Sequence, residues 1–362
     1  MLPPLAALPQ ELRKLAAVDP LGGWPEAQWR QLIHAGAARW NIPRDFDGDG
    51  WTGLQLLNAY RDIARGSLVA AFLLTQRNAA CQRIESSPNV TARQQLLPAL
   101  ARAEFFATVG ISHLTTSRQH LPLPAVVAAP LSSGCYRLDG CIPWASGASH
   151  AQVLVTGGTL ADGRQLLAAV NTRTAGVKIH PPTPLLGLSE SCTGAVELHG
   201  VEVTPPDLLH GPVEKVMAVS GGGAGSFSTT AVALGAALGT LDQLSAEARL
   251  NSGLRRYLEP LEAEASRIDS DLATAAAAAT PPPTPSAHPD QLRHRANSLA
   301  IRAAQVWMAA SKGAGYSLGH PAERAVRESL FFLVWSCPQT VLESHLQDLC
   351  FHHSAGTPAA GN

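Results

Sequence analysis

The hydrophobic residues change period twice along the chain, and this change constrains the fold more than any other feature. From residue 25 to about 104 they recur at spacings of three and four, which predicts helices, most clearly over 54–76. From 105 to about 207, short β-rich runs are separated by Gly, Pro and Ser, as in AQVLVTG (151–157). From 214 onward the helical period returns. The sequence therefore predicts an α+β fold in three blocks.

We interpret the three blocks as domains. They are an N-terminal α-helical domain (1–104), a central β-domain of barrel or sheet form (105–213) and a C-terminal helical bundle (214–362). In the β-domain, GTLADG (158–163) predicts a hairpin turn. The last block contains four long helical patterns, which predict a four-helix bundle: 228–250, 254–278, 290–312 and 322–349.

Charge and composition exclude several function classes. Lys and Arg number 27 and Asp and Glu number 28, so no basic field attracts nucleic acid or anionic lipid. No run reaches the roughly 18 uncharged apolar residues that cross a bilayer, and the first twenty residues do not have the pattern of a signal peptide. We therefore expect a cytoplasmic protein without membrane insertion. The six cysteines include no CxxC pair, so no disulfide framework is expected.

One acidic segment has part of the sequence pattern of a calcium-binding loop. Asp45, Asp47 and Asp49 have the spacing of the first half of an EF-hand loop. Position twelve of that loop needs a bidentate Glu, but here it is Leu56. The segment is better interpreted as a Gly-rich acidic turn, and the Cys-Phe-His-His segment at 350–353 as a solvated tail. No metal site is expected.

The order of the blocks and the run GAGYSLGHPAERAVRESLFFLVWSCPQ (313–339) resemble the acyl-CoA dehydrogenase superfamily of flavoproteins. The family pattern is a Gly-x-Gly-Tyr turn followed by a Pro-x-Glu-Arg-x-x-Arg-Asp/Glu helix. NIPRDFDGDG (41–50) is similar to the family's Pro-containing Gly-rich loop, which offers another reading of the acidic segment. The matching residues are Gly313, Gly315, Tyr316, Pro321, Glu323, Arg324, Arg327 and Glu328.

The resemblance implies a flavin site, with FAD as the cofactor. ATVGISHLTTS (107–117) looks like the family strand that passes under the flavin, which places Ser112 where a Thr usually donates to the ring. RLDGCIPWASGASHA (137–151) looks like the next strand and turn, with Trp144 against the isoalloxazine. A flat aromatic wall and hydroxyl donors suit this ring. The ring-binding residues implied are Ile111, Ser112, Ser117, Trp144 and Ser146.

The resemblance also implies contacts with the rest of FAD and with further subunits. ARLNSG (248–253) resembles the family's Arg-x-x-Phe-Gly motif, which makes Arg249 the cation for the diphosphate of a neighbouring subunit's FAD. Gly313 and Gln339 are further cofactor-binding candidates. Family members assemble through their bundles, so we expect a homodimer or homotetramer. One helix face carries small residues that allow close helix approach: Ala231, Gly235, Ala236 and Gly239.

The catalytic base of the family is missing at its expected positions. Dehydrogenation of a thioester needs a base for the acidic α-proton. Counting from the Gly-x-Gly-Tyr turn, the family's Glu falls on Ser336, and the alternative position on the helix that starts at 225–239 holds no acid. We therefore keep Ser336 and His113 as candidate catalytic positions. Two carboxylates are weaker candidates for the base: Glu190 and Glu343.

Three functions stay open. The first is an FAD-dependent acyl-CoA dehydrogenase-like oxidoreductase that acts on an acyl thioester or similar activated acid, with an electron-transfer partner. The second is a monooxygenase of the same superfamily, which takes reduced flavin from a flavin reductase together with O₂ and needs no α-proton base. The segment GCIPWASG (140–147) has the length of the turn in such enzymes. The third is a non-catalytic scaffold, which the altered turn at 113–119 permits.

Overall fold

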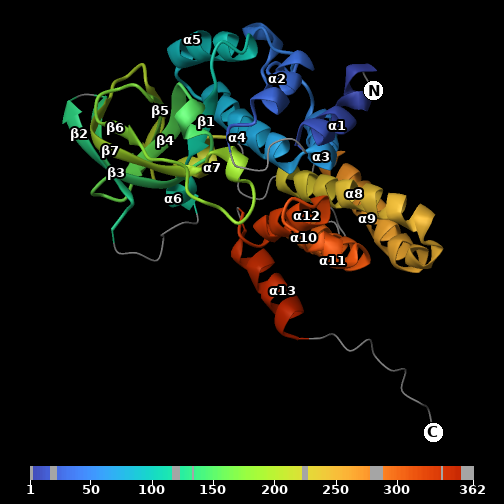
Figure 1. The fold of residues 1–362 in the computed structure, drawn as a ribbon. Helices are drawn as coiled ribbons and strands as arrows, with labels where there is room; N and C mark the ends of the chain where they lie inside the picture. Colours follow the sequence, from blue (N-terminus) through green and yellow to red (C-terminus); the bar gives the residue numbers. More distant parts are fainter. Residues whose placement is uncertain are drawn as a thin grey trace.

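The computed structural model describes residues 3–16, 23–115, 123–132, 134–221, 227–277, 288–335 and 337–351. Helices precede and follow the strands of one sheet in the chain, and the sheet lies at one side of the helical part (Figure 1), so the predicted α+β fold class is confirmed. The domain boundaries and the four-helix bundle stay predictions. None of the helices in these ranges combines the length and the apolar character that a membrane span needs.

The N-terminal helices surround one central apolar helix. They are α1 (Pro3–Ala16), α2 (Glu26–His34), α3 (Gly53–Gly66), α4 (Leu68–Glu85) and α5 (Val90–Ala101). Thr52 begins α3 with a capping box, in which its side chain accepts a hydrogen bond from the Gln55 backbone N–H. The first half of α4 (68–74) is wholly apolar, and most residues of the helix are buried. This helix therefore lies in the centre of the fold, where it contacts α3, α5, α8 and β1.

The sheet has eight strands in the order β6-β7-β3-β2-β4-β5-β8, with β1 parallel to β4. The strands are β1 (Ala107–Gly110), β2 (Val126–Ser132), β3 (Cys135–Ala145), β4 (Val153–Thr159), β5 (Gln165–Asn171), β6 (Val177–Ile179), β7 (Gly194–Val203) and β8 (Leu208–Val213). The predicted hairpin at 158–163 is confirmed, because β4 and β5 are antiparallel and joined there. On β4, Val153 and Val155 contact the core shared with α4 and α5, whereas Leu154 lies in the core of the other face.

The strand expected within 107–117 is shorter than the sequence suggested. The strand pattern at 107–117 ends at Gly110, and residues Ser112–Thr115 form a single helical turn, α6. Gly110, the last residue of the strand, is closely packed, because a Cβ there would lie 2.8 Å from Cγ2 of Ile142. The chain leaves the sheet at this point, next to α4.

The C-terminal part is helical. Its helices are α7 (Val216–Val219), α8 (Phe227–Leu250), α9 (Arg255–Ala277), α10 (Pro289–Ala310), α11 (Lys312–Gly315), α12 (Pro321–Ser329) and α13 (Gln339–Cys350). The first three long patterns match α8, α9 and α10 closely. The single helix predicted at 322–349 is wrong, because a 3₁₀ turn (Leu330–Leu333) and Pro338 separate α12 from α13. Proline disfavours helical backbone in the residue before it, so a continuous helix cannot pass this point.

The small-residue face of α8 packs against another helix of the same chain. A Cβ on Gly235 would lie 2.2 Å from the backbone oxygen of Arg61, and one on Gly239 would lie 2.5 Å from that of Arg65. Both oxygens belong to α3. These two glycines therefore allow α8 to approach α3 of the same chain, rather than a second subunit.

We expect the substitution Gly235→Ala to lower the free energy of unfolding by about 1–3 kcal/mol, because the added methyl group forces α8 and α3 apart. Urea unfolding followed by circular dichroism measures the change. Gly53→Ala is the control, since a Cβ at Gly53 meets no atom within 4 Å. Equal stability of the two variants would contradict the close packing of α8 on α3.

Candidate functional site

A cavity of about 720 Å³ lies where the sheet, α4 and the C-terminal helices meet. Its lining comes from β1, the end of β3, α4, the loop at 185–188, the start of α8 and the segment 327–338. It is the place where four of the predicted ring-binding residues come together. They are Ile111, Ser112, Trp144 and Ser146.

The sheet side of the cavity combines one aromatic ring with hydroxyl groups. Trp144 and Ser146 are two residues apart at the end of β3 and both line the cavity. Trp144 is 47% exposed. Gly147 then turns the chain in the left-handed region, with φ +67°, where a Cβ would lie 2.9 Å from the ring of Phe106. A larger residue at Gly147 would shift Trp144 and Ser146 together.

Two hydroxyl groups of the cavity, those of Ser112 and Ser146, can donate hydrogen bonds to a ligand. Thr193 Oγ1 donates to Ser146 Oγ at 2.8 Å, and it lies 2.7 Å from Ser191 Oγ. Since Ser146 accepts from Thr193, its own proton is available to another acceptor. Ser112 Oγ is buried with no hydrogen-bond partner in the structure. A buried hydroxyl without a partner costs about 1–3 kcal/mol, so an acceptor in the cavity would recover this energy.

One face of α4 forms the helical side of the cavity. Its lining residues recur at spacings of three and four, which places them on one stripe of the helix. They are Phe72, Thr75, Gln76, Ala79, Gln82 and Arg83. Tyr60 of α3 lies beside this stripe, and Asn78 Nδ2 donates to its hydroxyl at 2.8 Å. Burial raises the pKa of Tyr60 to about 12, so the phenol keeps its proton.

Three aromatic rings gather at one end of this stripe. Phe331 and Trp335 are stacked, with ring centroids 5.2 Å apart and planes 15° apart. Phe72 stands edge-on to both, at 5.0 and 5.2 Å. All three line the cavity. We call Phe72, Phe331 and Trp335 the aromatic cluster; it offers a flat apolar surface.

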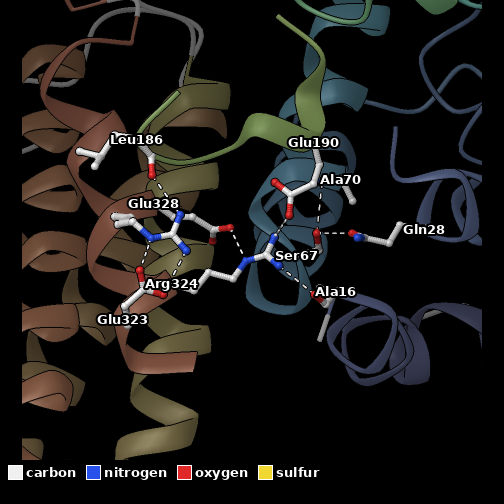
Figure 2. A network of polar contacts seen from close by, with 10 residues as sticks. Ala16, Gln28, Ser67, Ala70, Leu186, Glu190, Glu323, Arg324 and Glu328 are labelled. Carbon is white, nitrogen blue, oxygen red and sulfur yellow. Dashed lines mark hydrogen bonds and ion pairs between the residues drawn. The ribbon is translucent and has the colours of Figure 1, made fainter. Parts of the chain in front are cut away.

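The family-motif residues of α12 hold the loop that borders the cavity (Figure 2). Arg324 pairs with Glu190 at 2.9 Å and with Glu328 at 2.6 Å, and its Nη1 donates to the backbone oxygen of Ala16. Arg327 donates to the backbone oxygen of Leu186 at 2.9 Å and pairs with Glu323. The loop at 185–190 is therefore tied to α12 at two points.

The pKa values of two carboxyl groups in this network are shifted in opposite directions. The hydrogen bond from Arg327 holds the pKa of Glu323 below its usual value. Burial raises the pKa of Glu328, although Arg324 opposes this. Glu190, a weaker candidate for the base, is buried and paired with Arg324, and it does not line the cavity.

The other predicted residues that the structure describes do not line the cavity. His113 Nε2 is 3.0 Å from the backbone oxygen of Gly157, and burial lowers the pKa of this histidine. Arg249 is exposed near the end of α8, and Gly313 is exposed in α11. Gln339, the first residue of α13, donates to Glu343 at 2.9 Å. Ser117 and Ser336 lie outside the described residues.

The acidic turn is held by arginines. Asp47 pairs with Arg102 and Asp49 with Arg39, both at 2.9 Å. Across the described ranges, no three His, Cys, Asp or Glu side chains stand close enough together to hold a metal ion. Among the described residues that line the cavity, none is Asp, Glu or His.

Sequence reasoning missed the helical side of the cavity. The aromatic cluster, Tyr60 and Arg83 were not singled out, because a stripe at helical spacing is usually core. One signal was present in α4: several polar residues, among them Gln76, Gln82 and Arg83, interrupt a helix that is mostly buried. Polar residues in a buried helix are unusual and indicate that they have polar partners or a cavity beside them.

Comparison with known proteins found no matching family model. The dibenzothiophene monooxygenase of Rhodococcus qingshengii is 28% identical over 207 residues, which are 55% of this chain and 48% of that enzyme. The chain therefore spans about half the length of the curated relatives it matches.

Solved structures resemble the chain over nearly its whole length. Butyryl-CoA dehydrogenase from Megasphaera elsdenii has a TM-score of 0.80 at 14% identity and covers 97% of this chain and 99% of its own. Dibenzothiophene monooxygenase from Paenibacillus sp. A11-2 has a TM-score of 0.73 at 18% identity, with 96% and 97% covered. The latter enzyme has also been solved with FMN and indole. These likenesses show that the chain has the acyl-CoA dehydrogenase fold, as the motif at 313–339 implied.

Proposed function

We propose that this chain is a flavin-dependent monooxygenase built on the acyl-CoA dehydrogenase fold. The observation that carries the proposal is the composition of the cavity, which has an aromatic and hydroxyl side, an aromatic cluster and no carboxylate among its described lining residues. Abstraction of an α-proton from a thioester needs a base beside the substrate. An oxygenase does not remove such a proton, so this cavity suits oxygenation better than the dehydrogenation that the sequence favoured.

The residues present fit a flavin ring. Trp144 offers a half-exposed flat surface, and Ser112 and Ser146 each have a hydroxyl proton for acceptors on the ring edge. FMN and FAD share this ring. FAD is the cofactor that Arg249 implied, whereas the Paenibacillus monooxygenase was solved with FMN. Titration with both cofactors distinguishes them.

Reduced flavin, when bound, supplies two electrons to O₂, so that one oxygen atom enters the substrate and the other leaves as water. The chain's own residues position the reactants and exclude water. The aromatic cluster holds a planar apolar substrate against α4. The loop at 185–188, held through Leu186 and Glu190, borders the cavity and limits the entry of solvent. A separate flavin reductase is the proposed source of the reduced cofactor.

The test is oxygenation of an aromatic heterocycle. The protein is mixed with a flavin reductase, NADH, FMN or FAD, and dibenzothiophene or indole under ¹⁸O₂. We expect a product that carries one ¹⁸O atom, detected by mass spectrometry, and none when this chain is omitted. Bleaching of bound flavin by butyryl-CoA without O₂, together with no oxygenated product, would instead establish a dehydrogenase. A protein that retains no flavin would favour the scaffold.

A further inference from the structure

Three hydroxyl groups of the cavity wall form one continuous series of hydrogen bonds. Ser191, Thr193 and Ser146 all line the cavity, and all three are buried. Thr193 Oγ1 donates to Ser146 Oγ at 2.8 Å, and Ser191 Oγ lies 2.7 Å from Thr193 Oγ1. A threonine hydroxyl has one proton, and that of Thr193 is used on Ser146, so Ser191 is the donor to Thr193. The hydroxyl chain Ser191–Thr193–Ser146 therefore has one direction, and the proton of Ser146 remains for a ligand.

The backbone by itself holds the two segments that carry these hydroxyl groups. Strands β3 and β7 are antiparallel and pair at Ala145, which lies opposite Gly194. The backbone N–H of Gly147 donates to the backbone oxygen of Ser191 at 2.8 Å. These bonds set the register of the two segments without any side chain. The hydroxyl chain is therefore not needed for the register, and it is available to orient a ligand-binding group.

The turn that carries Ser191 has an unfavourable backbone conformation. Ser189–Ser191 form one 3₁₀ turn, and the residues on both sides of it, Leu188 and Cys192, lie in the left-handed region with φ +61° and +47°. Residues with a Cβ rarely adopt this region. Such positions persist where the surrounding structure holds them, and they are common at functional sites. Here the turn places the Ser191 hydroxyl beside that of Thr193.

We propose that Ser191 and Thr193 are positioning residues, which hold the hydroxyl of Ser146 as a hydrogen-bond donor toward the flavin ring. The proposal rests on the proposed flavin-dependent function and adds to it two residues that act through Ser146. Each hydrogen bond in such a series polarises the next, so Ser146 is a stronger donor than an isolated serine. An acceptor atom on the edge of the ring completes the series.

Neutron diffraction from crystals of the protein in D₂O tests the direction of the hydroxyl chain without depending on flavin. We expect the deuteron of Thr193 to be directed at Ser146 Oγ and that of Ser191 at Thr193 Oγ1. A Thr193 deuteron directed at Ser191 would overturn the proposal, whether or not the protein binds flavin.

Dissociation constants of FMN test whether Thr193 acts through Ser146. They are measured by quenching of flavin fluorescence. We expect Ser146→Ala to raise the constant about fivefold, because one neutral hydrogen bond is lost, and Thr193→Val to raise it about threefold, because a freely rotating hydroxyl is a weaker donor. Added to Ser146→Ala, Thr193→Val should have no further effect. Thr193→Ser restores the hydroxyl and should recover the affinity of the wild type.

Thr172→Val is the matched control. Thr172 Oγ1 donates to the backbone oxygen of Ala151 and does not line the cavity, so FMN affinity should not change. Thr193→Ala is the second variant if Thr193→Val does not fold. An equal loss from Thr193→Val with and without the Ser146 hydroxyl would contradict the proposal, because Thr193 would then contact the ring itself. If the wild type binds no flavin but the deuterons lie as expected, the proposed function fails and the hydroxyl chain stands.

Discussion

Replacing Trp144 by alanine is expected to raise the dissociation constant of the flavin about 30-fold. Trp144 lines the cavity and is 47% exposed. A flavin ring stacked on it would remove from water one face of the indole and one face of the flavin. Loss of this buried area and of the aromatic contact costs about 2 kcal/mol. Titration of the purified variant, followed by quenching of flavin fluorescence, measures the change.

Two further variants distinguish the loss of ring stacking from an unspecific loss of structure. Trp144→Phe keeps an aromatic surface and should recover most of the affinity. Tyr316→Ala removes an aromatic ring that is 82% exposed and lies outside the cavity, so flavin affinity should not change. If Trp144→Ala binds flavin as tightly as the wild type, the sheet side of the cavity is not the flavin wall.

The second large effect concerns the network that holds the loop. We expect Arg324→Met to lower the free energy of unfolding by about 3 kcal/mol, because the change leaves Glu190 and Glu328 without their shared cation. The loss should be smaller at pH 5 than at pH 8. Burial already raises the pKa of Glu328 in the folded state, so this group favours folding when protonated, and that contribution disappears as the pH rises through its folded pKa.

Urea unfolding at both pH values measures this prediction. Arg302→Met is the matched control, because Arg302 pairs with Glu264 on the surface with its side chain 44% exposed. Its loss should cost less than about 1 kcal/mol. If Arg324→Met and Arg302→Met are equally stable, the α12 network does not hold the loop.

The hydrophobic pattern predicted the fold class, and the resemblance to the acyl-CoA dehydrogenase superfamily implied the residues on the sheet side of the cavity. The two changes of hydrophobic period separate the helices from the strands because burial imposes a period of 3.6 or 2 on the sequence. Trp144 and Ser146 were implied by the resemblance of 137–151 to the family's strand and turn, and both line the cavity where β3 ends. The motif on α12 was recognised, but its structural role, in which Arg324 and Arg327 hold the loop, depends on contacts distant in sequence.

The remaining features depend on tertiary contacts that spacing does not encode. Gly235 could equally face another subunit or its own chain, and only the approach of α3 decides this. His113 has the sequence position of a turn residue, but its ring is directed to the backbone of β4 at Gly157. Phe331 and Trp335 meet Phe72 of α4 across more than 250 residues of chain. No local pattern in 313–339 indicates that contact.

A crystal structure of the protein with FMN tests the central claim most directly. The account predicts that the isoalloxazine lies against Trp144, with an acceptor atom of the ring within hydrogen-bond distance of Ser112 Oγ. The aromatic cluster should remain accessible to a substrate beside the ring. A flavin bound elsewhere on the chain, or with Ser112 still lacking a partner, would contradict the account.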